Sequence, residues 1–387
     1  MDGADQAHNR LTEGAPPLVR TAFHHSCLCV VKSIRWFPVG FVLAVFFWSY
    51  YTFVLELVYL RESSFFIQIV YLLIYHALVI MFLWSFVMTI VTNPGTAPDN
   101  WKLSPDQISR LQGAHSEDEW KNQLQSAVAE MGVHVCQRSV QGAIRYCEVC
   151  FVIKPDRAHH CSVCETCILK MDHHCPWVNN CIGFGNYKFF LLFVTYGYAY
   201  CIFLIATTLS YTIGFWTEGL DEDGNRIGSI HILFLFFVSS VFFLFLSSLF
   251  WYHLFLLFFN RSTLEQFRTP VFVNCGAEKK SYHLGKMANF RQVFGSIPFQ
   301  WCLPIYSTVG DGLSYPLNSR VSDTVVKECN NGGGINLSQS QPQPQPPPTP
   351  SASVVYRNDN ASVRIDMTNQ YHNGSGGGQG HGIGTQV

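Results

Sequence analysis

The chain has 387 residues, of which 48% are hydrophobic and 13% are charged, a charged share about half that of soluble domains. Its formal net charge of −1 excludes the strong positive field that attracts nucleic acids, so we expect no nucleic-acid partner. Fourteen cysteines are present, but seven of them fall between Cys147 and Cys181. This clustering indicates one local site and not a disulfide framework spread over the chain.

Four apolar stretches are each long enough to cross a bilayer, which takes about 20 residues. They cover residues 39–60, 65–91, 189–216 and 230–259. A buried helix of a soluble protein can be equally apolar, but four such stretches predict an α-helical integral membrane protein. No basic segment with a small-residue cleavage site precedes the first stretch, so we expect it to remain as an anchor.

The charges that flank these spans predict their orientation. Basic residues stand before the first span and after the fourth, whereas the loop between the third and fourth spans is acidic. The positive-inside rule therefore places both termini in the cytosol and the acidic loop outside. Residues 92–188 must then be cytosolic too, where thiols stay reduced. The charges are Arg20, Lys32, Arg35, Glu218, Asp221, Glu222, Asp223, Arg261 and Arg268.

Composition divides the chain into six parts. Ser104-Pro105 followed by residues 107–131 predicts a capped polar helix that acts as a connector inside the cytosolic loop. The glycine runs and Gln-Pro alternation beyond residue 317 predict a disordered tail, because they cannot form a core. We therefore expect a cytosolic N-terminus (1–37), spans one and two (38–91), a cytosolic loop (92–188) with a cysteine-rich domain at about 145–188, spans three and four (189–259), a cytosolic C-terminal domain (260–316) and the tail (317–387).

The cysteine-rich block has the spacing of zinc ligands. Three Cys-x2-Cys steps in a reducing compartment favour zinc, which takes four ligands in a closed site. Two closed sites need eight ligands, and seven cysteines with His160 and His174 offer nine. We expect the spare ligand to be Cys175, since it neighbours His174 and their side chains diverge. His159 and His173 are further candidates, so spacing alone leaves the pairing open.

Several motifs resemble the DHHC family of protein S-acyltransferases. The block from Cys147 to Cys181, with Asp172-His173-His174-Cys175-Pro176-Trp177, is similar to the family's cysteine-rich domain. Ser262-Thr263-Leu264-Glu265 resembles its Thr-Thr-x-Glu motif. Asn289-Phe290-Arg291-Gln292-Val293-Phe294-Gly295 resembles the C-terminal motif of the subgroup with human members two, fifteen and twenty. Asn93-Pro94-Gly95 stands where the family often has Asp-Pro-Gly, a change that keeps the chemistry of a turn.

This resemblance implies two interleaved structural zinc sites with no open position for water. It also implies that a long-chain acyl-CoA, such as palmitoyl-CoA, donates its acyl group to cysteines of membrane-associated proteins. The subgroup suggests the Golgi and the plasma membrane as locations. The implied zinc ligands are Cys147, Cys150, His160 and Cys167 for one ion, and Cys161, Cys164, His174 and Cys181 for the other.

Thioester exchange needs a thiolate, and a free cysteine with a pKa of about 8.5 is mostly protonated in the cytosol. Cys175 is therefore expected to be the nucleophile, His173 its base and Asp172 the residue that orients the imidazole. A membrane adaptor with the same spans and zinc ligands would need none of these three. A transporter is disfavoured, because the spans lack paired ionisable residues.

The resemblance also places the end of an acyl-chain cavity near Ser49 on span one and Tyr200 on span three, with Trp48 beside it. A simple hydrogen bond between the two helices is the alternative for this pair. We further expect Lys154, Arg157 and His159 to bind the phosphates of coenzyme A, or else to be ordinary surface charges. Two cysteines before span one, Cys27 and Cys29, stand where S-acylation is common.

Overall fold

The computed structural model describes residues 33–217, 226–272, 276–319 and 321–322, with the side chains of residues 226–229 left aside. The chain divides into two units, Met1–Asn336 and Leu337–Val387, and only the first contains described residues. Cys27, Cys29, the acidic loop and nearly all of the predicted tail lie outside them.

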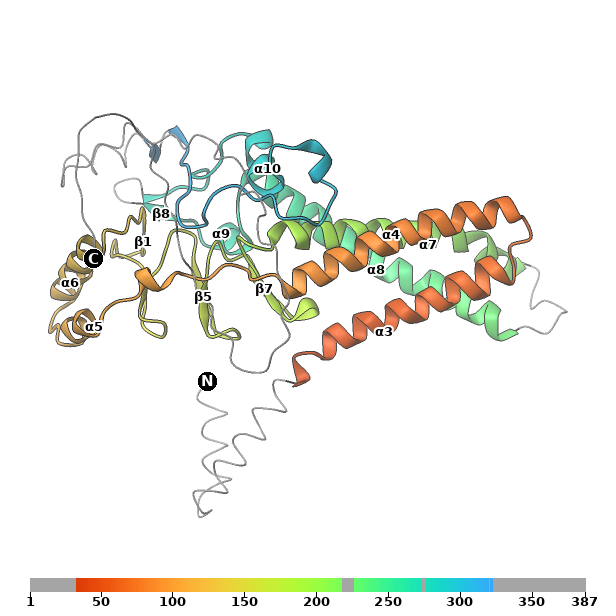
Figure 1. Cartoon of the computed structure of the whole chain (residues 1–387), viewed down its shortest axis with the longest axis horizontal. Coiled ribbons are helices and arrows are strands. Elements are labelled where there is room, and N and C mark those ends of the chain that lie inside the picture. The colour runs from red at the N-terminus through yellow and green to blue at the C-terminus, as the bar shows by residue number, and fades with distance from the viewer. Residues whose placement is uncertain (1–32, 218–225, 273–275, 320, 323–387) are drawn as a thin grey trace, which may run out of the picture. The chain divides into compact units, whose positions relative to one another are not determined.

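Four long apolar helices form the membrane region (Figure 1). They are α3 (Phe37–Tyr51), which continues as the π-helical segment η1 (Thr52–Tyr59), α4 (Phe65–Val91), α7 (Tyr187–Thr217) and α8 (Arg226–Phe259). The segments long and apolar enough to cross a membrane are Phe37–Tyr59, Phe65–Val91, Tyr187–Thr217 and Ile230–Phe259. The predicted spans are confirmed, and their ends differ from these by at most two residues.

Aromatic side chains fill the interior of the helix bundle. Phe53 stacks on Tyr75 with ring centroids 4.3 Å apart, and Phe82 stacks on Tyr200 at 6.0 Å. The Tyr200 hydroxyl also lies 2.9 Å from that of Tyr75 and 2.8 Å from Ser49 Oγ. Hydrogen bonds between hydroxyl groups thus join spans one, two and three inside the bundle, where polar groups need partners within the protein.

The connector between the second and third spans is two helices and not the single helix predicted. Ser104 caps α5 (Pro105–Gln112) in a reciprocal pair with Gln107, and Ser116 caps α6 (Glu117–Met131). The break falls at Gly113, where α5 ends. Glycine weakens a helix interior, and a second serine cap offers the next helix its own start.

Three short antiparallel hairpins form the cysteine-rich domain, at one end of the long helices (Figure 1). They pair β2 (Tyr146–Cys147) with β3 (Val152–Ile153), β4 (His159–Cys161) with β5 (Thr166–Ile168), and β6 (His173–Cys175) with β7 (Asn180–Ile182). Other short elements complete this side: η2 (Asp99–Trp101), η3 (Pro176–Val178), α9 (Thr263–Phe267), α10 (Lys286–Phe294), η4 (Pro298–Gln300), and a sheet of β1 (Gln137–Arg138), β8 (Val271–Phe272) and β9 (Gly276–Ala277).

A turn at Asn93-Pro94-Gly95 attaches these hairpins to the end of α4. Asn93 Oδ1 accepts the Gly95 N–H at 2.8 Å, and Gly95 has a φ of 95°, which favours glycine. The Pro94 and Gly95 carbonyls accept the N–H groups of Gly185 and Leu169 at 2.8 and 2.9 Å. Asparagine therefore makes the turn that the family's aspartate would make.

Candidate active site and zinc centres

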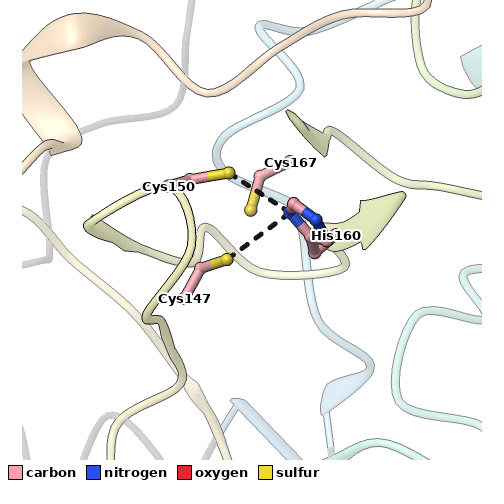
Figure 2. A group of neighbouring side chains, drawn as sticks. All are labelled: Cys147, Cys150, His160 and Cys167. Atoms are coloured by element: carbon pink, nitrogen blue, oxygen red, sulfur yellow. Dashed lines mark hydrogen bonds between the residues drawn. The ribbon is translucent and has the colours of Figure 1, made fainter. Parts of the chain in front are cut away.

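Two groups of four side chains lie in the hairpins with the geometry of metal sites. In the first, His160 Nδ1 lies 3.2 Å from Cys150 Sγ and 3.6 Å from Cys147 Sγ, and Cys167 completes the group. Figure 2 shows these four side chains converging on one point. Within each group the ligand atoms lie within 4.8 Å of one another.

The second group is built around His174. Its Nδ1 lies 3.5 Å from Cys164 Sγ and from Cys181 Sγ, and 3.8 Å from Cys161 Sγ. Three thiols and one imidazole at this spacing fit structural zinc, which they would surround without an open position. Both groups are those that the resemblance implies, and neither contains His159, His173 or Cys175.

The hairpins repeat at intervals of 14 residues, a signal that the sequence reasoning missed. Cys147, Cys161 and Cys175 each end the first strand of a hairpin. The three turns also share a left-handed residue, with φ values of 53°, 54° and 45°, at Phe151, Glu165 and Asn179. In each zinc group, one hairpin supplies a Cys-x2-Cys pair and the following hairpin supplies a histidine and a cysteine.

Cys175 is free because the repeat stops. Its hairpin carries Val178 where the earlier hairpins carry Cys150 and Cys164. After β7 the described chain runs through residues 183–186 into α7, so no further hairpin follows there to supply a histidine and a cysteine. Cys175 is 5% exposed and packs in the core beside the spans.

A hydrogen-bonded chain leads from His173 to the C-terminal domain. His173 Nδ1 lies 2.7 Å from Asp172 Oδ2. Thr263, at the start of α9, donates its backbone N–H to Asp172 Oδ1 at 2.9 Å and its hydroxyl to Oδ2 at 2.8 Å. Because Nδ1 is held by the carboxylate, Nε2 is the nitrogen left for chemistry at the thiol.

Electrostatics favour a charged pair at Asp172 and His173. Burial disfavours the imidazolium, but hydrogen bonds to Asp172 and Cys175 outweigh it and raise the pKa of His173 to about 9. Burial would likewise raise the pKa of Asp172, yet the hydrogen bond with His173 and nearby positive groups lower it. The pair thus favours an imidazolium at His173 beside an ionised Asp172.

His253 of α8 is a neighbour of this pair that the sequence reasoning did not find. It is buried, and its ring lies 5.8 Å from that of His173 and edge-on to Phe190 at 4.9 Å. The Tyr187 hydroxyl lies 3.3 Å from His253 Nδ1. One ring nitrogen of His253 lies within 4.8 Å of a carboxylate oxygen of Asp172 and of a ring nitrogen of His173. The sequence signal was a histidine inside an apolar span, where an ionisable group is costly.

Arg157 does not belong to an exposed cationic group, which corrects the expectation that it binds a phosphate. It is 1% exposed, and its guanidinium donates to both Glu265 carboxylate oxygens at 2.7 and 2.6 Å. Its remaining donors reach the side chain and carbonyl of Asn260. Glu265 also accepts the Ser262 N–H in a capping box. Ser262 and Glu265 of the Ser-Thr-Leu-Glu motif therefore anchor the Arg157 loop, while Thr263 holds Asp172.

Lys154 and His159 line a polar cavity of about 510 Å³. Arg138, Arg145 and Arg268 line the same cavity, with Glu117 and Glu265 as its carboxylates. Burial, followed by the positive charge of Arg145, lowers the pKa of His159 to about 3, so that ring is uncharged near pH 7. The cation expected at His159 is thus corrected, and arginines that sequence reasoning missed supply the charge.

Cys175 also lines an apolar chamber of about 290 Å³ between the spans, called here the proximal chamber. Phe190, Phe193 and Trp177 line it as well. A second, distal chamber of about 90 Å³ is lined by Ser49, Tyr200 and Leu204 among others. Ser49 and Tyr200 are hydrogen-bonded to each other at 2.8 Å, which is the contact that the alternative expects. Their place at the end of an acyl-chain cavity stays a prediction.

Trp48 lines neither chamber, which corrects its expected place beside the acyl chain. Its indole Nε1 donates to His231 Nδ1 of α8 at 3.3 Å. Neighbouring residues on a helix point about 100° apart, so Ser49 and Trp48 cannot share one face.

Comparison with known proteins agrees with this geometry. Residues 140–269 match the family model of the DHHC palmitoyltransferase. Palmitoyltransferase ZDHHC2 of Homo sapiens is 47% identical over 285 residues, which cover 74% of this chain and 76% of that protein. Palmitoyltransferase ZDHHC20 of Homo sapiens is 43% identical over 292 residues, 74% and 78% of the two chains. Palmitoyltransferase ZDHHC20-A of Danio rerio is 45% identical over 293 residues, 76% and 80%. This chain belongs to the DHHC palmitoyltransferase family and is a multi-pass membrane enzyme, a protein S-palmitoyltransferase.

Proposed function

We propose that the enzyme takes a long-chain acyl group from acyl-CoA onto Cys175 and passes it to cysteine thiols of membrane-associated proteins at the cytosolic face. One observation carries this proposal: Cys175 lies outside both zinc groups and lines the proximal chamber. A thiol that is free of metal is available as a nucleophile, and an apolar chamber beside it can bury a hydrocarbon chain.

The first half-reaction loads the enzyme. The Cys175 thiol proton moves to His173 Nε2, while Asp172 holds Nδ1 and stabilises the imidazolium. The thiolate attacks the thioester carbonyl carbon, a new bond from Cys175 Sγ to that carbon forms, and the bond from the carbon to the sulfur of coenzyme A breaks. Coenzyme A leaves with the proton from His173. Two thioesters of similar energy are exchanged, so no energy source is required.

The second half-reaction unloads the enzyme by the same groups. The thiol of a target cysteine gives its proton to His173 Nε2 and attacks the acyl-Cys175 carbonyl. The Cys175 Sγ–carbon bond breaks, and the Cys175 sulfur takes the proton back. The position of Cys175 beside the spans favours target cysteines close to the membrane surface, because only those reach the thioester.

The polar cavity would bind the head of coenzyme A. Arginine and lysine are the usual partners of phosphate groups, and Lys154, Arg138, Arg145 and Arg268 all line this cavity. The hydrocarbon chain would then occupy the proximal and distal chambers. Burial gains about 0.8 kcal/mol for each methylene group, which favours long chains until the cavity ends.

Zinc would hold the three hairpins in register and supply no reaction chemistry, since each group offers four protein ligands. Loss of one ligand should therefore act through folding. The site residues of the reaction remain Cys175, His173 and Asp172.

We also propose that both termini face the cytosol and that the protein resides in the Golgi membrane, the plasma membrane or both. Span one is preceded by Arg35, and span four is followed by Arg261 and Arg268. Basic residues at these two ends support a cytosolic location of both termini by the positive-inside rule. A tagged copy in cells, probed before and after selective permeabilisation of the plasma membrane, tests both statements.

Incubation of the purified full chain with palmitoyl-CoA tests the proposed reaction. Intact mass should show one added palmitoyl group, removed by hydroxylamine and absent in Cys175→Ser. A membrane adaptor with the same zinc groups would add no mass. Labelling that persists in Cys175→Ser would place the nucleophile elsewhere and overturn the mechanism.

A further inference from the structure

The proximal and distal chambers share part of their lining, and one of the shared positions lacks a side chain. Five residues line both chambers, and we call them the waist. Gly197 of α7 is the only glycine among them. The waist consists of Val42, Phe82, Gly197, Phe242 and Leu246.

Gly197 lies on the face of α7 that lines both chambers. Phe190 and Phe193 line the proximal chamber and Tyr200 lines the distal one. Their spacing from Gly197 by three, four and seven residues places them on one helical face. With a rise of 1.5 Å per residue, Gly197 lies about 10 Å along the axis from Phe190 and about 4.5 Å from Tyr200.

Space at Gly197 is limited by the two side chains that lie over it. A Cβ atom added there would lie 3.3 Å from Leu246 Cδ1 and 3.3 Å from Phe82 Cε2. These contacts are tighter than ordinary packing, so even alanine would push against the waist. Glycine weakens a helix interior relative to alanine, and its lack of a side chain is what lets Phe82 and Leu246 lie this close to α7.

We propose that Gly197 sets acyl-chain selectivity by leaving the waist open, so that long chains pass from the proximal chamber into the distal one. This inference rests on the proposed function, because it assumes an acyl chain that starts at Cys175. A side chain at position 197 would end the usable cavity before Ser49 and Tyr200. It would leave the reacting groups untouched, since Cys175 lies in the proximal chamber.

The variant Gly197→Val tests this, with Gly214→Val as a matched control. Both glycines lie in α7, so both substitutions change the same helix in the same way. A Cβ at Gly214 meets nothing within 4 Å, and Gly214 lines neither chamber. The full chain is offered equimolar acyl-CoAs of ten, fourteen, sixteen and eighteen carbons, and intact mass reports which acyl-enzymes form.

We expect Gly197→Val to lower the sixteen-carbon to ten-carbon ratio by about tenfold or more, since about two methylenes or more lose their burial. Retained ten-carbon acylation shows that the variant is folded. The milder Gly197→Ala should shift the ratio less, and adding Leu246→Ala to Gly197→Val should restore long chains by reopening the waist. Gly214→Val should keep the parent profile.

An unchanged profile in an active Gly197→Val enzyme overturns the inference. So does an equal loss at every chain length with normal zinc content, or an equal shift in Gly214→Val, because each would show an effect on the helix and not on the passage. Failure of the parent protein to form any acyl-enzyme would instead overturn the proposed function.

Discussion

Thr263 donates hydrogen bonds to both carboxylate oxygens of Asp172, one from its backbone N–H and the other from its hydroxyl. The contact joins a residue after the fourth span to the carboxylate that holds the His173 ring. If His173 is the base that we propose, the Ser-Thr-Leu-Glu motif acts on the reaction through Asp172. It does so without touching the thiol itself.

Thr263→Val should slow acyl-enzyme formation by about tenfold, because it deletes one hydrogen bond to a charged group and keeps the shape of the side chain. Thr263→Ser retains the hydroxyl and should stay close to the parent. Stopped-flow or quenched acylation with palmitoyl-CoA measures both rates. Equal rates for the valine and serine variants would show that the hydroxyl does not orient Asp172.

Cys175→Ser should abolish acylation and keep both zinc ions, because Cys175 belongs to neither ligand group. Cys181→Ser is the matched comparison, since it removes a ligand from a closed site and should lose zinc and stability together. Zinc content by mass spectrometry of the metals, beside thermal unfolding, separates the two. About two ions in the parent are required, and a loss of zinc in Cys175→Ser would contradict the assignment.

His173→Ala should reduce acylation by about 10²–10⁴-fold, the usual effect of losing a positioned base. The loss should shrink as pH rises, because hydroxide then removes the thiol proton directly. In the parent, by contrast, the raised pKa of His173 means that its ring already holds the proton near neutral pH, so the acylation rate should depend less on pH. Rates measured from neutral to alkaline pH give the test, and a variant with full activity at neutral pH would exclude His173 as the base.

Arg157 and Lys154 should respond differently to loss of charge. Arg157→Met removes one partner of a buried ion pair with Glu265 and should destabilise the domain by about 3–5 kcal/mol. Lys154→Met should leave stability unchanged and raise the KM for palmitoyl-CoA, since Lys154 lines the polar cavity. Thermal unfolding and steady-state kinetics distinguish them. A stable Arg157→Met enzyme with only a raised KM would restore the phosphate-binding role.

The end of the distal chamber should also control chain length. Tyr200→Ala should favour chains longer than sixteen carbons, and Ser49→Phe should favour fourteen or fewer, because each buried methylene adds about 0.8 kcal/mol until it meets a wall. Ser49→Phe should still admit longer chains than Gly197→Val, which closes the cavity nearer to Cys175. Competition between acyl-CoAs ranks the three variants, and the reverse order would be incompatible with this arrangement of the chambers.

Sequence reasoning succeeded where the information is local. Hydrophobicity over about 20 residues is sufficient to place a span, and cysteine spacing identifies a zinc-type block. It failed where a residue meets a partner from elsewhere in the fold. Arg157 looked like a surface cation because Glu265, 108 positions away, gives no local sign of the pair. His253 was missed for the same reason, since only the packing of α8 brings it to Asp172 and His173.

The 14-residue repeat also carries a consequence for how this active site could arise or be lost. The same position in three hairpins belongs to a candidate zinc group twice and is the proposed nucleophile once, although the surrounding backbone is alike. What differs is whether another hairpin follows. The cysteine of a hairpin with a following hairpin lies in a four-residue ligand group, and the cysteine of the last hairpin does not. The free thiol therefore results from the position of Cys175 in the last of three tandem hairpins. A fourth hairpin inserted after residue 182, together with Val178→Cys, would complete a third ligand group around Cys175. Cys175 would then be a metal ligand, and the matching cysteine of the new last hairpin would be the free thiol.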